Sequence, residues 1–112
     1  MITDIPIELA NLYNLEELIL SDNHISSMPK ELGQLKNLER LSLAYNNIET
    51  VPDELAQLQN LRSLKLNNNQ ITNIPLEFKN LTNLKNLNIS TNKLIRSDIR
   101  EFRNKCKFDV SF

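Results

Sequence analysis

Serine, aspartate and histidine stand together at Ser21, Asp22 and His24, and these residue types activate a nucleophile in many hydrolases. They follow one another along a single short segment, and no pattern around them predicts a pocket that could hold a substrate. His24 is the only histidine in the chain, so a metal ion would find no second imidazole here. We therefore expect no catalytic residues and no metal site.

Two other residues, Cys106 and Gly33, give equally weak evidence for catalysis or ligand binding. Cys106 is the only cysteine, which excludes an internal disulfide and a thiolate metal cluster. It fits a small apolar residue of a C-terminal cap, and the alternative is a reactive thiol or an intermolecular disulfide. Gly33 is the only glycine, so the chain has no glycine-rich phosphate loop. The sequence predicts neither an enzyme nor a bound cofactor.

Asparagine recurs with a fixed period, inside the pattern Leu-x-x-Leu-x-Leu-x-x-Asn-x-Ile that returns every 23 residues without insertions. The four copies begin at Leu15, Leu38, Leu61 and Leu84. The second half of each unit also repeats, as the apolar-Pro pairs Met28-Pro29, Val51-Pro52 and Ile74-Pro75. A period of this kind indicates one domain built from stacked units. We divide it into a half repeat, three full repeats, a partial repeat and a cap: 1–14, 15–37, 38–60, 61–83, 84–95 and 96–112.

Each unit predicts a strand and a tight return. Apolar and variable residues alternate, as in Leu18-Ile19-Leu20, which is typical of a short strand with one buried face. Identical strands one repeat apart would pair in parallel. The prolines suit the first position of a helical return. Because the next leucines are three residues apart, we expect a 3₁₀ or irregular turn.

The recurring asparagines are predicted to be structural. They lie where each strand bends toward the core, and an amide there can both donate and accept hydrogen bonds. We expect them to tie the backbones of neighbouring repeats together in a ladder formed by Asn23, Asn46, Asn69 and Asn92.

These repeats resemble the leucine-rich repeat family, over residues 2 to about 95. The 23-residue Leu-Pro type resembles the subclass found in small bacterial proteins, notably those of spirochaetes. The resemblance implies an α/β solenoid, a short right-handed horseshoe with a parallel β-sheet on its concave side and 3₁₀ or irregular helical turns on its convex side. It also implies protein–protein recognition, usually through the concave side, with no enzymatic activity or cofactor shared across the family.

Composition places bounds on location and partners. No stretch approaches the ~20 apolar residues of a membrane span, and the start of the chain lacks the features of a signal peptide. We expect a cytoplasmic protein that does not insert into membranes; an export signal ahead of this sequence is the alternative. Residues 1–60 carry ten acids and three bases (net −7), whereas residues 61–112 carry four acids and ten bases (net +6). A linear stack should therefore have an acidic and a basic end.

The two ends are expected to differ. At the C-terminal end, Ser97 is a good N-cap for a helix over 98–105 that turns Ile99, Phe102 and Cys106 to one face. A short final strand should follow, with alternating Phe108, Val110 and Phe112. At the N-terminal end we expect partly uncovered apolar residues: Ile2, Ile5, Leu9, Leu12 and Leu18. Three explanations stay open: the half repeat suffices as a cap, the chain derives from a longer protein, or the edge pairs with a second copy to give a homodimer.

Exposed strand positions form columns across the predicted concave face, and we expect a protein partner to bind there. The columns are Glu17, Arg40, Ser63 and Asn86; then Ile19, Ser42, Lys65 and Asn88; and, at the strand exits, Asp22, Tyr45, Asn68 and Thr91. Tyr45 and Arg40 are the favoured anchors, because tyrosine and arginine are enriched at binding hot spots. Two alternatives remain: self-association through the N-terminal edge or the oppositely charged halves, and anion binding by the basic end. We expect no nucleic-acid binding, since the basic half lacks interleaved aromatic residues on an open face.

Overall fold

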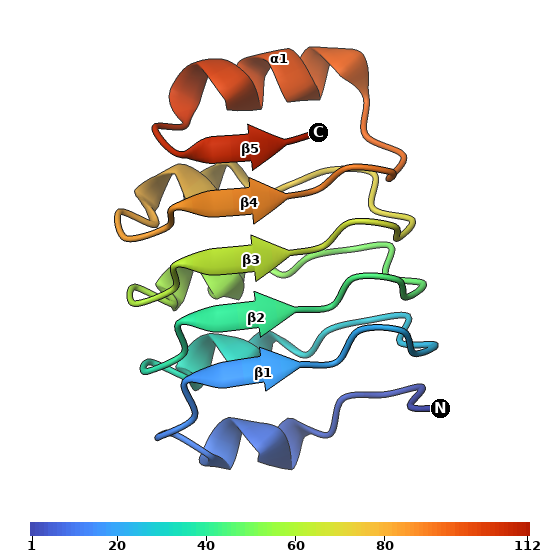
Figure 1. Cartoon of the computed structure of the whole chain (residues 1–112), viewed down its shortest axis with the longest axis vertical. Helices are drawn as coiled ribbons and strands as arrows, with labels where there is room; N and C mark the ends of the chain where they lie inside the picture. Colours follow the sequence, from blue (N-terminus) through green and yellow to red (C-terminus); the bar gives the residue numbers. More distant parts are fainter.

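Short parallel strands form a single sheet in chain order, β1-β2-β3-β4-β5 (Figure 1). The computed structural model describes residues 1–112 and measures 36 × 28 × 17 Å. The strands are β1 (Glu17–Ile19), β2 (Arg40–Ser42), β3 (Ser63–Lys65), β4 (Asn86–Asn88) and β5 (Asp109–Ser111). Their register follows the 23-residue period, since Leu18 pairs with Leu41 and Leu41 with Leu64. The expected parallel solenoid is therefore confirmed.

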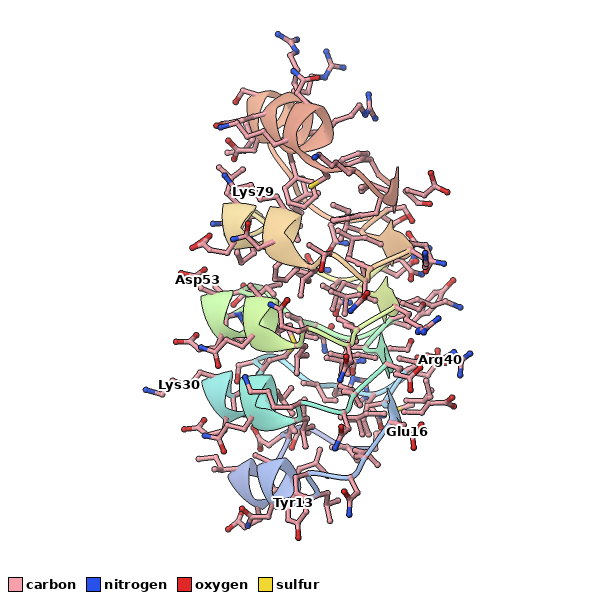
Figure 2. The ribbon with its side chains drawn as sticks, turned by 90° about the vertical axis from the view of Figure 1, so that its left-hand side faces the viewer. Tyr13, Glu16, Lys30, Arg40, Asp53 and Lys79 are labelled. Atoms are coloured by element: carbon pink, nitrogen blue, oxygen red, sulfur yellow. The ribbon has the colours of Figure 1, made fainter.

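Tight 3₁₀ turns return the chain along the opposite side of the molecule from the sheet (Figure 2). They are η1 (Ile7–Asn11), η2 (Lys30–Gln34), η3 (Asp53–Gln57) and η4 (Leu76–Asn80). Each turn follows a proline. The sequence predicted proline at the first helical position, whereas it occupies the N-cap, one residue before that position. Pro29 has φ −70° and ψ 141°, an extended conformation that the fixed φ of proline permits as readily as a helical one.

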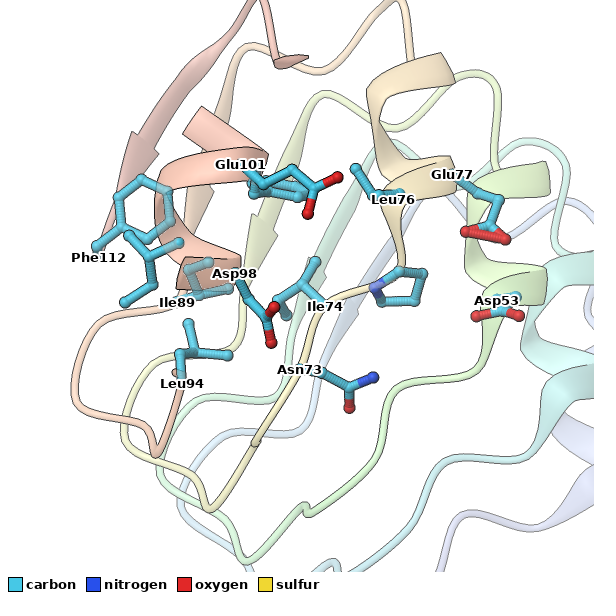
Figure 3. Close-up of a pocket in the computed structure, with 13 residues that line it drawn as sticks. Asp53, Asn73, Ile74, Leu76, Glu77, Ile89, Leu94, Asp98, Glu101 and Phe112 are labelled. Carbon is cyan, nitrogen blue, oxygen red and sulfur yellow. The ribbon is translucent and has the colours of Figure 1, made fainter. Parts of the chain in front are cut away.

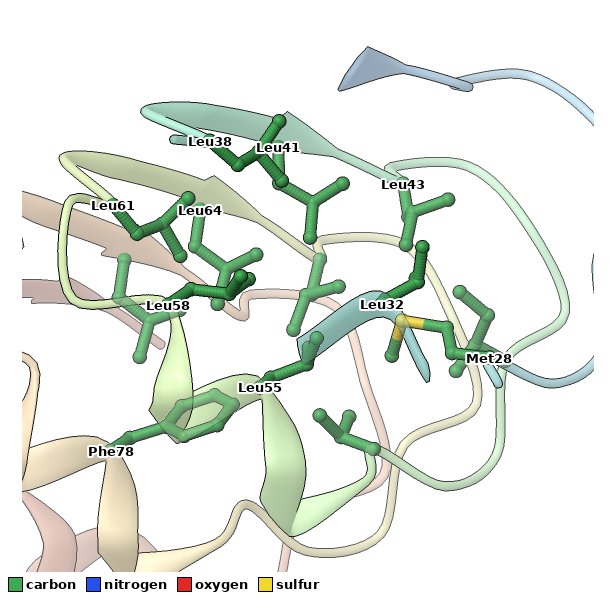
Figure 4. Packing of buried hydrophobic residues seen from close by; sticks show 14 of the residues in the cluster. Met28, Leu32, Leu38, Leu41, Leu43, Leu55, Leu58, Leu61, Leu64 and Phe78 are labelled. Carbon is green, nitrogen blue, oxygen red and sulfur yellow. The ribbon is translucent and has the colours of Figure 1, made fainter. Parts of the chain in front are cut away.

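The core is a continuous stack of leucines between the sheet and the turns (Figure 4). Leu41, Leu64 and Leu87 come from the strands, and Leu55 and Phe78 come from the turns. Leu55, Leu64 and Phe78 are completely buried. Because each repeat covers the next, the central repeats carry the most stabilising packing, at ~1.5–3 kcal/mol for each leucine-sized side chain.

The C-terminal end is closed by α1 (Arg96–Lys105) followed by β5. Phe102 is buried beneath the helix, and its ring makes edge-to-face contacts with Phe108 and Phe112, both at 6.5 Å between centroids. The predicted helix start at residue 98 with a Ser97 cap was wrong. Ile95 occupies the N-cap without a side-chain hydrogen bond, and solvent can satisfy the N–H groups of this exposed first turn.

The N-terminal end of the stack shows apolar side chains at its surface. Ile2 and Leu12 are exposed, as expected, and so is Tyr13. Ile5 and Leu18, which were expected to be partly uncovered, are instead buried in the hydrophobic core. Because the strands keep chain order, the acidic half of the sequence lies at this end and the basic half lies around β4, α1 and β5.

Candidate functional site

Asparagine side chains hold the strand exits of neighbouring repeats together. The Oδ1 atom of Asn46 accepts the Ile25 N–H at 3.0 Å, and its Nδ2 donates to the Leu20 carbonyl at 3.0 Å and the Leu43 carbonyl at 3.1 Å. The bonds recur one period later at Asn69 and again at Asn92. Each amide therefore joins two repeats, which positions the concave surface.

A second asparagine column lies at the strand entrances, and sequence reasoning missed it. Asn37 donates from Nδ2 to the Tyr13 carbonyl at 2.8 Å. Asn60 and Asn83 make the same bond to the repeat before each of them, at 2.9 and 2.7 Å. The signal was available in the 23-residue spacing of these asparagines. Both ends of β2, β3 and β4 are thus held by side-chain amides.

A left-handed backbone occurs at the last position before each ladder asparagine. The four residues with positive φ are Asp22 (60°), Tyr45 (58°), Asn68 (59°) and Thr91 (54°). Aspartate and asparagine tolerate this conformation, but a bulky or β-branched residue does so at a cost. Tyr45 and Thr91 are therefore strained, and nothing in the side-chain pattern alone identified the turn.

Two of the expected columns lie on the strands of one sheet and the third lies just beyond the strand ends, with one clear correction. Ile19 and Tyr45 are each 54% exposed, and Arg40 and Lys65 are also exposed. Ser42, which we expected at the surface, is 7% exposed because its hydroxyl bonds the Ser21 hydroxyl at 2.7 Å. The remaining predicted positions range from exposed to half-buried: Glu17, Asp22, Ser63, Asn68, Asn86 and Asn88.

Burial of Ser42 leaves a shallow depression in the sheet. Its volume is about 340 Å³, and its walls include Ile19, Arg40, Ser63 and Lys65. Arg40 contacts Glu17 at 3.5 Å, with both side chains more than half exposed. An exposed pair of this kind contributes little stability. Lys65 has no carboxylate within ion-pair distance, so the depression carries an apolar wall beside a free positive charge.

The structure shows how the potentially reactive side chains of the sequence are arranged. No hydrogen bond joins the side chains of Ser21, Asp22 and His24; the Ser21 hydroxyl bonds Ser42 instead. No group of three or more His, Cys, Asp or Glu side chains is arranged to hold a metal ion. Burial raises the pKa of the Cys106 thiol from 9.0 to about 11, which disfavours the nucleophilic thiolate.

One further geometric finding concerns membranes: none of the helices combines the length and the apolar character that crossing a bilayer requires.

The repeated strands, 3₁₀ returns and asparagine ladder define a solenoid repeat protein. The family model described as "Leucine rich repeat" matches residues 13–71, and a second, described as two copies of the repeat, matches residues 59–104. The chain belongs to the leucine-rich repeat family, and its likeness is to spirochaete-type bacterial members. A comparison with curated proteins gives no significant match.

Solved structures show the same repeat in much longer proteins. A leucine-rich repeat protein of Leptospira interrogans is 42% identical with a TM-score of 0.89, covering 98% of this chain and 28% of that protein. The ectodomain of the Arabidopsis thaliana receptor kinase GASSHO1/SCHENGEN3, solved in complex with CASPARIAN STRIP INTEGRITY FACTOR 2, is 34% identical (TM-score 0.78, 89% and 13% covered). Internalin C2 of Listeria monocytogenes is 32% identical (TM-score 0.73, 83% and 39% covered). The chain thus spans between an eighth and two fifths of these proteins.

Proposed function

We propose that this chain is a non-enzymatic module that binds a protein partner through the concave face of its sheet. The observation that carries the proposal is the exposure of two large side chains, Ile19 on β1 and Tyr45 just beyond the end of β2. Apolar and aromatic groups at a rigid, regular surface are typical anchors of protein interfaces. The similar receptor ectodomain, which was solved in complex with CASPARIAN STRIP INTEGRITY FACTOR 2, supports a binding role for the fold.

The conformation of Tyr45 strengthens this proposal. An exposed tyrosine at φ 58° gains little from packing within the chain, while asparagine occupies the same position one repeat later with less strain. Strained, exposed residues are concentrated at functional sites, where a contact with a partner explains their retention. Tyr45 is therefore the first anchor of the proposed interface.

The depression around Ser42 suggests the chemistry of the partner. Arg40 and Lys65 supply positive charge, Ser63 supplies a hydroxyl and Ile19 supplies an apolar wall. An acidic side chain next to an apolar one would match this arrangement, since a carboxylate can accept hydrogen bonds from all three polar groups. We infer a partner segment that combines a carboxylate with an apolar residue.

Substitution of the two anchors tests the proposal. Peptides would be selected from a random display library against the wild-type chain and then titrated against the double variant Tyr45→Ala and Arg40→Ala. We expect binding to weaken by at least about 100-fold, because hot-spot residues contribute ~2 kcal/mol or more each. Lys30→Ala, on the convex turn η2, is the matched control and should bind normally. Unimpaired binding by the double variant, with an unchanged melting temperature, would refute the site.

Two single substitutions distinguish the contribution of Tyr45 to peptide binding from its effect on the stability of the fold. Tyr45→Asn places a residue that tolerates positive φ at the strained position, so stability should rise by ~1 kcal/mol while peptide binding falls. Thr91→Asn relieves the same strain at β4 and keeps Tyr45, so it should gain stability without losing affinity. If both variants bound the peptide equally well, Tyr45 would have no role in recognition.

Self-association is the second candidate, favoured by the exposed Ile2, Leu12 and Tyr13 at the N-terminal end. A second copy stacked on this end, or oppositely charged halves in contact, would bury these groups. Light scattering at two protein concentrations and two salt concentrations tests both routes. A dimer that persists in high salt supports the apolar contact, whereas one that dissociates supports the charged contact. A 13.0 kDa monomer throughout would contradict self-association.

A further inference from the structure

A cavity of about 300 Å³ lies on the far side of the molecule from the sheet's open face, between η4 and α1 (Figure 3). Ile74, Leu94 and Phe112 are among the seven hydrophobic residues that line it. It forms where the repeat pattern stops, because α1 replaces a fifth 3₁₀ turn and sends only Phe102 fully into the core. Its volume is at the low end of the ~300–1,000 Å³ typical of small-molecule sites.

Carboxylates surround the mouth of this apolar cavity. Asp98 and Glu101 come from α1, and Asp53 and Glu77 come from η3 and η4, so the acids approach from both sides (Figure 3). None of the thirteen lining residues is a lysine, arginine or histidine. The cavity therefore combines an apolar interior with a negatively charged rim, although twelve of its thirteen lining residues come from the basic half of the chain.

Few cations within the chain neutralise this rim. Glu101 contacts Lys105 at 3.4 Å, and no ion pair involves the other three carboxylates. Asp98 lies in the first turn of α1, where the positive end of the helix dipole offsets part of its charge. Arg103 lies 4.7 Å from the centroid of the Phe112 ring but does not line the cavity. A net negative rim remains.

We propose that this cavity binds a small organic cation, with a primary ammonium group at the carboxylate rim and an apolar body against Ile74 and Leu94. The cation would compensate charges that the chain leaves unpaired, and the apolar body would displace water from hydrophobic walls. The proposal is independent of the concave face, since the two surfaces share no residue.

Three fragments with one apolar body and different charges test the proposal: phenethylamine, 2-phenylethanol and 3-phenylpropionate. Each would be titrated into the ¹⁵N-labelled chain and followed by amide chemical shifts. We expect saturable shifts at Ile74, Leu94, Ile99 and Phe112 with phenethylamine, and a dissociation constant of about 1 mM for a fragment of this size. The alcohol should bind more weakly, and the carboxylate should not bind.

Substitutions of the rim carboxylates are the second test of the proposal. Glu77→Gln and Asp98→Asn remove exposed charges without touching the core, so the fold should persist. Each should weaken phenethylamine binding about threefold, the scale of an exposed charge pair. Glu31→Gln is the matched control, because Glu31 occupies in η2 the place of Glu77 in η4.

Binding at the cavity that decreases from the amine to the alcohol to the carboxylate would support the proposal. The rim variants should weaken this binding, and Glu31→Gln should not. Equal shifts with all three fragments would mean that the cavity takes apolar groups regardless of charge, and absence of shifts with phenethylamine would mean that it takes no such ligand. Either of these results would overturn the proposal and leave the concave-face proposal untouched.

Discussion

Replacement of Asn46 by alanine is the sharpest test of how the solenoid is held together. The side chain is only 6% exposed. It accepts a hydrogen bond from the Ile25 N–H at 3.0 Å and donates to the carbonyls of Leu20 and Leu43 at 3.0 and 3.1 Å. Alanine removes these bonds and leaves the buried Ile25 N–H without a partner. The Leu20 carbonyl keeps a hydrogen bond from the Asn23 amide, and the Leu43 carbonyl keeps one from the Asn69 amide.

The expected cost follows from counting those groups. The buried Ile25 N–H left unsatisfied costs ~1–3 kcal/mol, and each hydrogen bond lost from a carbonyl that keeps another partner costs ~0.5–1.5 kcal/mol. The one unsatisfied donor and the two lost carbonyl bonds together predict a decrease of ~2–4 kcal/mol in the free energy of unfolding. Because domains of this size are stable by only ~5–15 kcal/mol, the effect should be large.

Equilibrium urea unfolding, followed by circular dichroism, measures this loss. Asn47→Ala is the matched control, since the adjacent side chain is exposed, and it should change stability by less than ~0.5 kcal/mol. Asn92→Ala, in the half-buried last rung, should have an intermediate effect. If Asn46→Ala were as stable as Asn47→Ala, the ladder would not be a stabilising element and the reasoning would be refuted.

Three more predictions concern packing and the thiol. Gly33→Ala should lower stability by ~2 kcal/mol or more in urea unfolding, because the added Cβ would collide with the Glu54 carbonyl oxygen; unchanged unfolding would contradict this close packing. Leu64→Ala should cost ~2–5 kcal/mol in thermal and urea unfolding, since the side chain is completely buried; an unchanged melting temperature would contradict its place in the core. Cys106 should react with iodoacetamide about 100-fold more slowly in the folded than in the unfolded chain at pH 8, because its folded pKa is about 11. That burial contributes stability below pH 9 and loses it as the pH rises through 11; equal reaction rates would contradict it.

Much of the fold was predictable from periodicity because every repeat imposes the same requirement. The alternation around Leu18 predicted a strand, and the fixed spacing to Leu41 and Leu64 predicted the parallel register that the structure shows. The rows of leucines predicted the core in the same way. In a solenoid each unit contacts only its neighbours, so sequence order translates directly into spatial order.

The departures arise where individual side chains differ from the repeat. Ser42 is small enough to lie below its neighbours and to bond Ser21, which a column of exposed positions does not reveal. The turn requires a positive φ at the Tyr45 position of the repeat, and Asp22 and Asn68 are residue types that adopt it readily. Tyrosine rarely adopts a positive φ, so Tyr45 gave no indication of the turn. The cavity beside α1 depends on the fit between a helix and a 3₁₀ turn, for which the repeat offers no precedent.

Mapping the surface that a selected peptide contacts tests the central proposal most directly. The ¹⁵N-labelled chain would be titrated with a library-selected peptide, and amide shifts would be assigned to the sheet, the turns or the ends. We predict shifts concentrated at Ile19, Arg40, Tyr45 and Lys65, across β1 to β3. Shifts confined to the η turns or to α1, with these four residues unaffected, would contradict recognition through the concave face.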